Sequence, residues 1–382
     1  MKTKLILFII LLFVIGCTTT EKKGAQPDDG AIVIDVNSAL KNEPRNFEDM
    51  IESIELIPLE TTEASVIEYA QKCFVTDKYL FVMDVYQSSL GLILFDRNGK
   101  FIKRFQRGNG PEELPFYTDV FYADGYWYVL GGNKLAKYTD NGKFVDCKIF
   151  DDMSDEIQKV GNRFLSVQSQ SPDNKFKIIE LDSNLTKINE LCLDLMPFPF
   201  FEGLFCYDGE NCLIFKMTDN NIYSYDNSNG FEIKYRLEYP DFEYKISYDK
   251  YEHQRDAFSK MVNDMDRSKY FFYENNVNCE DYLIFDLLSN DTSVDILYNK
   301  NTGTACVLNI NKETDYLLWE MREAYISGQK NTLCGIILPE DIEDCWTNNP
   351  NNLLSAKDIE ILKNAKPDDN PIIVIYKLKD NL

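Results

Sequence analysis

The stretch Leu92-Ile93-Leu94-Phe95-Asp96-Arg97-Asn98-Gly99-Lys100-Phe101 decides the fold, because its pattern recurs along the chain. An apolar strand ends on an aromatic residue, a turn of Asp, Asn and Gly follows, and a second strand begins at once. Asn-Gly accepts the positive φ that tight hairpins require. The stretch therefore predicts a β-hairpin, and each further copy of the pattern predicts another.

Five further copies follow at regular intervals. The residues that stand just before each turn mark the count: Phe95, Tyr138, Leu181, Tyr225, Tyr298 and Tyr376. The intervals between these anchors are 43, 43, 44, 73 and 78 residues. A period near 43 is typical of a four-stranded propeller blade, and the two long intervals leave room for insertions of about 30 to 35 residues. Each of the first five anchors is also preceded by another strand rich in β-branched and aromatic residues.

The repeat predicts an all-β chain in which residues 31–382 form a six-bladed β-propeller with helical insertions in the last two blades. A lone blade leaves both faces exposed, whereas radial stacking buries them and closure of the ring removes the terminal edges. The last anchor lies close to the end of the sequence, so the final blade lacks its outer strand. We expect an N-terminal strand, at 32–36 or at 54–59, to supply it.

The two insertions have helical patterns. In the first, which covers 241–276, residues 251–267 lack Pro and Gly and space their apolar residues as an amphipathic helix does. The second comprises 313–328 and 355–365, where Ser355 is placed as an N-cap and Asp358 as its capping-box partner. Such helices either line a pocket on one face of the disc or cover apolar surface, and the sequence leaves both readings open.

The N-terminus predicts export. Residues 1–16 have a positively charged start and an apolar run from Leu5 to Ile15, which is too short to span a bilayer and is typical of a secretory signal. Val14-Ile15-Gly16-Cys17 resembles a bacterial lipobox, and this resemblance implies cleavage before Cys17 and lipidation of that residue, with palmitate-like chains that anchor it stably. The alternative is an ordinary signal with an incidental cysteine. Polar residues 17–30 predict a flexible tether.

Charge and cysteine usage limit the partners. Forty Lys and Arg oppose 63 Asp and Glu, giving a net charge of −23, which repels nucleic acid and anionic lipid head groups. Nine cysteines remain besides Cys17, none of them in a CxxC pair, and with a single histidine we expect no metal site. Cys206 and Cys212 flank a predicted turn at 208–211, so a cross-strand disulfide and two buried free thiols are both open there.

A search for chemistry gives no catalytic residue and no cofactor. The single histidine, His253, falls in the predicted helix of the first insertion and is interpreted as a surface residue. The stretch Gly108-Asn109-Gly110 lacks the lysine and helix start of a phosphate-binding loop, so it predicts a connection between blades. Aromatic side chains are the better candidates for ligand contacts around the central opening. The candidates are Tyr126, Trp127, Tyr316, Trp319 and Trp346.

With the repeat established, the chain resembles the six-bladed β-propeller lipoproteins of Bacteroidetes, which are similar to NHL-repeat propellers. The resemblance rests on Ile57-Pro58-Leu59-Glu60-Thr61-Thr62, on Phe95-Asp96-Arg97-Asn98-Gly99-Lys100-Phe101 followed by Arg107-Gly108-Asn109-Gly110-Pro111-Glu112-Glu113, and on the closing strand at 370–379. The family more often has a glycine where this chain has Glu112, which bears on the loop conformation and not on the fold. It implies no catalytic residues.

These features favour an anchored binding module of the cell envelope that presents one face of the disc to a glycan, a peptide or a partner protein. The predicted signal and lipobox indicate the outer membrane, and they do not distinguish the periplasmic from the surface-exposed side. Two alternatives stand beside this reading. One is a polysaccharide hydrolase or lyase that uses carboxylates on the propeller face. The other is a structural subunit of an outer-membrane complex.

Overall fold

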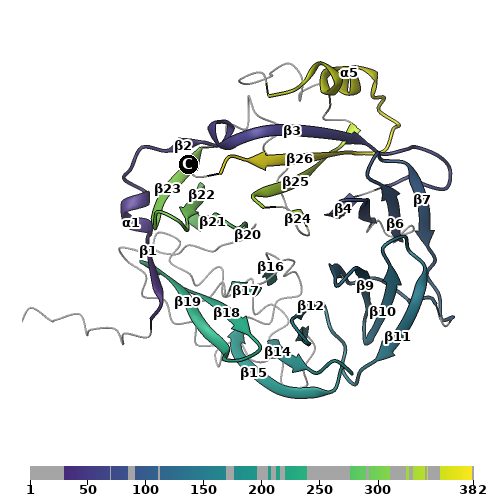
Figure 1. Ribbon diagram of the computed structural model, residues 1–382, viewed down its shortest axis with the longest axis horizontal. Coiled ribbons are helices and arrows are strands. Elements are labelled where there is room, and N and C mark those ends of the chain that lie inside the picture. The colour runs from purple at the N-terminus through teal and green to yellow at the C-terminus, as the bar shows by residue number, and fades with distance from the viewer. Residues whose placement is uncertain are drawn as a thin grey trace, which may run out of the picture.

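A computed structural model shows six small sheets arranged in a ring around one axis, which confirms the six-bladed β-propeller (Figure 1). The signal and the lipobox lie outside the described residues. The structure describes residues 30–68, 70–84, 91–110, 112–168, 176–195, 205–207, 212–215, 220–238, 276–289, 292–309, 324–326, 330–339, 342 and 353–380. Within these ranges, no helix is both long enough and apolar enough to cross a membrane.

Five blades are meanders of four antiparallel strands in sequence order. The first blade holds β4 (Ala70–Val75), β5 (Tyr79–Asp84), β6 (Gly91–Asp96) and β7 (Phe101–Phe105). The second holds β8 (Asp119–Ala123), β9 (Tyr126–Gly131), β10 (Lys134–Thr139) and β11 (Phe144–Ile149). The third holds β12 (Glu156–Val160), β13 (Arg163–Gln168), β14 (Phe176–Leu181) and β15 (Lys187–Leu195).

The fourth and fifth blades follow the same plan. The fourth holds β16 (Phe205–Tyr207), β17 (Cys212–Phe215), β18 (Asn221–Asp226) and β19 (Gly230–Glu238). The fifth holds β20 (Val277–Asn278), β21 (Tyr282–Ser289), β22 (Thr292–Asn299) and β23 (Thr304–Asn309). In Figure 1 the first strand of each of these blades lies near the centre and the fourth lies at the rim, as β16 and β19 show.

The sixth blade is assembled from both ends of the chain. It contains β25 (Thr332–Ile337), β26 (Ile372–Leu378) and, as its outer strand, β3 (Ile51–Pro58). The β26–β3 ladder is antiparallel and runs from Ile372 opposite Pro58 to Leu378 opposite Ile51. The expected closure of the ring by an N-terminal strand is therefore confirmed.

The other N-terminal strand has a different partner. Strand β1 (Ile32–Asp35) pairs in parallel with β19 of the fourth blade, and β2 (Arg45–Asn46) pairs in parallel with β23 of the fifth. Helix α1 (Val36–Ala39) and the 3-10 helix η1 (Phe47–Met50) connect these strands to β3. Residues 32–58, which we call the N-terminal belt, thus add one strand each to blades four, five and six and cover their outer edges (Figure 1).

The six anchors occupy equivalent places. The first five lie in the third strand of their blades, opposite a residue of the second strand, and Tyr376 lies in the middle strand β26 of the sixth blade, opposite Leu333 of β25. Each anchor has 4% or less of its surface exposed. The predicted repeat is therefore the structural repeat.

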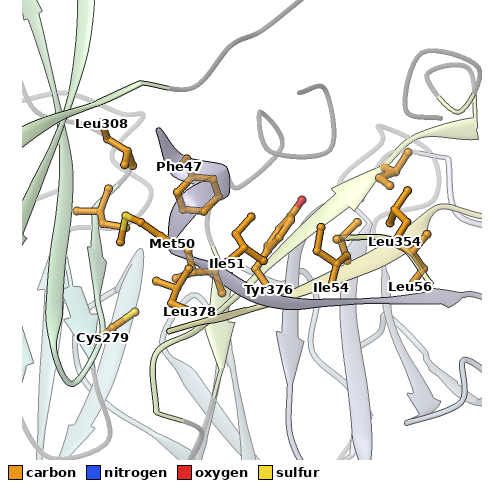
Figure 2. Close-up of a cluster of buried hydrophobic side chains, with 14 of the residues drawn as sticks. Phe47, Met50, Ile51, Ile54, Leu56, Cys279, Leu308, Leu354, Tyr376 and Leu378 are labelled. Carbon is orange, nitrogen blue, oxygen red and sulfur yellow. The ribbon is translucent and has the colours of Figure 1, made fainter. Parts of the chain in front are cut away.

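Apolar clusters fill the spaces between the blades. The cluster that joins the fifth blade, the sixth blade and the N-terminal belt contains Phe47, Met50 and Ile51 of the belt together with Tyr376 and Leu378 of β26 (Figure 2). The rings of Phe47 and Tyr376 meet edge to face, with centroids 6.3 Å apart. The belt is thus packed into the core of the closing blade.

The predicted helices have mixed outcomes. Helix α5 (Ala356–Asn364) is present, and the Ser355–Asp358 capping box is formed. Residues 251–267 lie outside the described part of the chain. The end of the predicted helical stretch 313–328 is instead the strand β24 (Ala324–Ile326), which pairs in parallel with β4. Pairing with an inner strand overrides the helical pattern there, and the Ala-Tyr-Ile sequence suits a strand.

Candidate functional site

The two ends of the ring differ in their connections. Because neighbouring strands run in opposite directions, the end where a first strand begins is also the end where a second strand stops and a third begins. We call this end the loop face and the opposite end the turn face. Tight turns close the turn face, with positive φ at Gly99, Asp124, Gly125, Gly142, Gly161, Leu185, Gly230, Gly303 and Asn331. The long connections, including those at 239–276, 310–323 and 338–371, start and finish at strand ends that lead to the loop face.

Buried side chains link the first strands to one another at the loop face. Asp119 accepts hydrogen bonds from its neighbour Val120 N (2.9 Å) and from Ile157 N (2.9 Å) in the first strand of the next blade. Glu156 in turn accepts from Phe205 N (3.1 Å) in the blade after that. Strands β8, β12 and β16 each form the inner end of their sheet in the described part of the chain, so the N–H groups on that edge need acceptors other than a further strand. These carboxylates therefore set the spacing of the inner strands.

The glycine-rich stretch after β7 is a loop closed by its own carboxylate. The side chain of Glu113 folds back and accepts a hydrogen bond from Gly110 N (2.9 Å). A Cβ at Gly108 would lie 2.0 Å from Glu113 Oε2, so a larger residue there would displace the end of this side chain. Glu112 contributes its carbonyl oxygen to Tyr138 Oη (3.0 Å), a contact that any residue type can make. The stretch is a connection between blades, as predicted.

The connection from β3 into β4 is held by two residues that sequence reasoning missed. Asn370, which is buried, donates from Nδ2 to the carbonyl oxygens of Glu60 (2.8 Å) and Ser65 (2.9 Å) and accepts at Oδ1 from Ile67 N (2.8 Å). Arg104 donates to the carbonyl oxygens of Ala64 and Val66. Asn370 is the first residue of the stretch 370–379, which carries part of the family resemblance, and this position could have indicated its role. For Arg104, the sequence of β7 offered no indication of such a role.

The structure does not gather the aromatic candidates into one site. Trp127 is fully buried between the first and second blades, where its indole donates to Asp140 O (3.0 Å) and its ring lies 4.5 Å from Phe81. The prediction that Trp127 contacts a ligand is therefore wrong, because a fully buried side chain is not accessible to a ligand. Tyr126 begins β9 at the turn face and is half-buried, with Lys137 Nζ 3.7 Å from its ring centre. Tyr316, Trp319 and Trp346 lie outside the described residues.

The cross-strand disulfide left open at Cys206 and Cys212 is excluded. Cys206 stands opposite Leu213, and Cys212 stands opposite Tyr207. Successive side chains of a strand point to opposite faces of a sheet, so the two thiols enter different inter-blade clusters. Neither thiol forms a disulfide, and within the described ranges no group of three or more His, Cys, Asp or Glu residues is placed to hold a metal ion.

The ring with its loop face, its closing strand and its glycine-rich loop can now be compared with known proteins. Residues 31–377 match the model of a family described as "Domain of unknown function (DUF4934)". The chain belongs to this family. The DUF4934 region runs from the N-terminal belt into the closing strand β26. A search of curated proteins found no match.

A solved structure shares the fold of this DUF4934 protein, and others align with lower scores. The crystal structure of a Bacteroides fragilis protein described as exported aligns with a TM-score of 0.69 and 17% identity, over 92% of this chain and 100% of that one. A streptogramin B lyase aligns with a TM-score of 0.42 and 11% identity, over 74% and 80% of the two chains. A Bacteroides caccae protein of unknown function gives 0.36 and 12%, over 63% and 87%. At these identities the likeness concerns the fold alone.

Proposed function

We propose that this DUF4934 protein is a lipid-anchored binding module of the bacterial envelope that takes a glycan, a peptide or a partner protein at its loop face. The observation that carries this proposal is the asymmetry of the ring. One end is closed by tight turns, whereas the long connections lead to the other end. Binding residues in proteins concentrate on long loops that a rigid scaffold positions.

The contacts at the loop face favour binding over catalysis. The buried carboxylates of Asp119 and Glu156 are bonded to backbone N–H groups of the next blade. A general acid or base needs a side chain that faces a substrate and exchanges a proton with it. These two carboxylates instead hold the first strands in place, and the glycine-rich loop is closed by Glu113.

The anchor in this proposal rests on the N-terminal sequence. The apolar run that ends at Gly16-Cys17 matches a lipobox, and only a short polar stretch separates Cys17 from β1 at the rim of the fourth blade. The Bacteroides fragilis protein that shares the fold is itself described as exported. A single acyl chain binds membranes marginally, and several chains anchor a protein stably.

Cys17→Ala is expected to release the protein from membranes. Without the thiol no acyl chain can be attached, so the substituted protein should move from the membrane fraction to the soluble fraction of the envelope. Incorporation of labelled fatty acid and fractionation measure this directly. Cys147→Ala, which removes a half-buried thiol of β11, is the matched control and should stay with the membranes. Membrane partitioning of Cys17→Ala equal to that of the parent protein would contradict the anchor.

A photo-reactive benzophenone side chain at Asp152 is expected to capture the ligand, and the same group at Ser228 is not. Both positions are exposed; Asp152 lies in the connection from β11 to β12 that leads to the loop face, whereas Ser228 lies in a tight turn of the turn face. Benzophenones insert into C–H bonds, so glycans, peptides and proteins are all captured. Irradiated cells are analysed by the mass of the adduct. Adducts from Ser228 alone, or none from Asp152, would refute binding at the loop face.

A further inference from the structure

The seam between the last and the first blade contains a pair of cysteines. Cys73 lies in β4, the first strand of the first blade, opposite Ala324 of β24. Cys334 lies in β25 of the sixth blade, and β25 lies against β4. The seam is the place where the two ends of the repeat array meet, so a contact here holds the ring closed.

The two cysteines lie as free thiols in the same apolar cluster. Both side chains are 1% exposed and belong to the cluster that fills this seam. The thiol of Cys334 donates to the carbonyl oxygen of Cys73 at 3.8 Å. The neighbouring Cys334 side chain and then burial raise the pKa of the Cys73 thiol well above its usual range.

We propose that Cys73 and Cys334 form a disulfide that locks the last blade to the first. The proposal rests on the export included in the proposed function, because disulfides persist in extracytoplasmic compartments and are reduced in the cytosol. The bond would close a loop that contains most of the ring. Cross-links of this kind stabilise a fold chiefly by restricting the unfolded chain, and the effect grows with the size of the loop.

The oxidant is a disulfide, R–S–S–R, of the kind that thiol oxidases and oxidised glutathione supply. One cysteine thiolate attacks it, which forms a mixed disulfide and releases one R–S⁻. The second cysteine thiolate then attacks the first cysteine sulfur, which forms the Cys73–Cys334 bond and releases the second R–S⁻. Two electrons pass from the cysteines to the oxidant, and the two cysteine protons end on the two R–SH molecules. Since burial disfavours the thiolate, we expect this exchange during folding, before the seam closes.

The full chain, refolded with oxidised glutathione, tests the proposal. The protein is unfolded in the presence of N-ethylmaleimide, so that every free thiol is blocked as it becomes accessible, and it is then digested without reduction. We expect a linked peptide pair that joins residues 73 and 334 and is lighter by two hydrogens than the two thiol peptides together. In thermal unfolding, a reductant should lower the midpoint of the linked protein by roughly 5 °C or more.

Two variants separate this bond from other effects of reductant. The Cys73→Ala/Cys334→Ala double variant should lose the dependence on reductant. Cys212→Ala, which removes a fully buried thiol from another inter-blade cluster, should keep it. Recovery of residues 73 and 334 as separate, maleimide-blocked peptides from the folded protein would overturn the proposal. Refolding takes place without export, so this failure is distinct from a failure of the anchor or of ligand capture.

Discussion

Gly99→Ala is expected to lower the free energy of unfolding by about 3–5 kcal/mol, which places it among the most damaging single substitutions. Gly99 lies in the turn between β6 and β7 with φ of 80°. A Cβ there would lie 2.1 Å from the carbonyl oxygen of Pro58, the last residue of β3, which is the outer strand of the sixth blade. Backbone cannot yield as a flexible side chain does. The substitution would therefore push β3 away and weaken the bond from Glu60 N to Gly99 O (2.8 Å).

Gly125→Ala separates this clash from the strain of positive φ. Gly125 has φ of 78°, nearly that of Gly99, but a Cβ there meets no atom within 4 Å. Its expected loss is the left-handed backbone penalty alone, about 1–2 kcal/mol. Urea unfolding of the two variants, followed by tryptophan fluorescence, measures the difference. Equal losses at Gly99 and Gly125 would show that the approach to Pro58 does not matter to stability.

The equivalent turn of the second blade shows how the contact between the first and the sixth blade differs from the other contacts between blades. The nearest atoms to a Cβ at Gly142 would be side-chain atoms of Leu94 and Phe105, at 3.0 and 3.3 Å. Both turns therefore touch the outer strands of the preceding blade. At the closing seam, however, that neighbour is the N-terminal strand, which the chain must bring back from its other end. Among the glycines that the structure describes, the tightest approach of a Cβ to backbone thus falls where the ring is completed.

The repeat was predictable because its pairings are local. Each of the first five anchors pairs with a strand that is separated from it by a turn or a short connection, as Tyr138 does with Trp127 and Phe144. Turn residues and apolar spacing record such pairings in the sequence. The period of the anchors then fixes the number of blades. The count of blades also predicted that an N-terminal strand completes the ring, because the last blade lacked an outer strand.

The N-terminal belt was not predictable in the same way. Residues 32–36 have the pattern of a strand, but β1 pairs in parallel with β19, about 200 positions away, with Ile32 opposite Tyr235. No turn connects them, so nothing near either strand records the partner. Trp127 failed as a ligand candidate for a related reason. Both faces of a blade are buried against neighbouring blades, so the sequence of such a strand does not show whether an aromatic side chain is buried or exposed to solvent.

Phe47→Ala tests whether the belt is part of the closing core, and we expect it to lower the free energy of unfolding by about 3–5 kcal/mol. Phe47 is fully buried in η1, where its ring packs edge to face on Tyr376 and beside Met50 (Figure 2). Truncation removes this ring and leaves a cavity between the belt and β26. Chemical denaturation gives the loss in stability, and limited proteolysis should show faster cleavage after Lys41 in the belt.

Val33→Ala is the matched control, because Val33 belongs to the same belt but is 46% exposed, and its truncation should change stability by less than about 0.5 kcal/mol. A double-mutant cycle of Phe47→Ala with Tyr376→Ala should give a coupling of about 0.5–1.5 kcal/mol from the ring contact. If Phe47→Ala unfolded at the same urea concentration as Val33→Ala, the belt would be a covering of blade edges only. A loss confined to Phe47 would mean that the ring is closed by β3 together with the residues that lead into it.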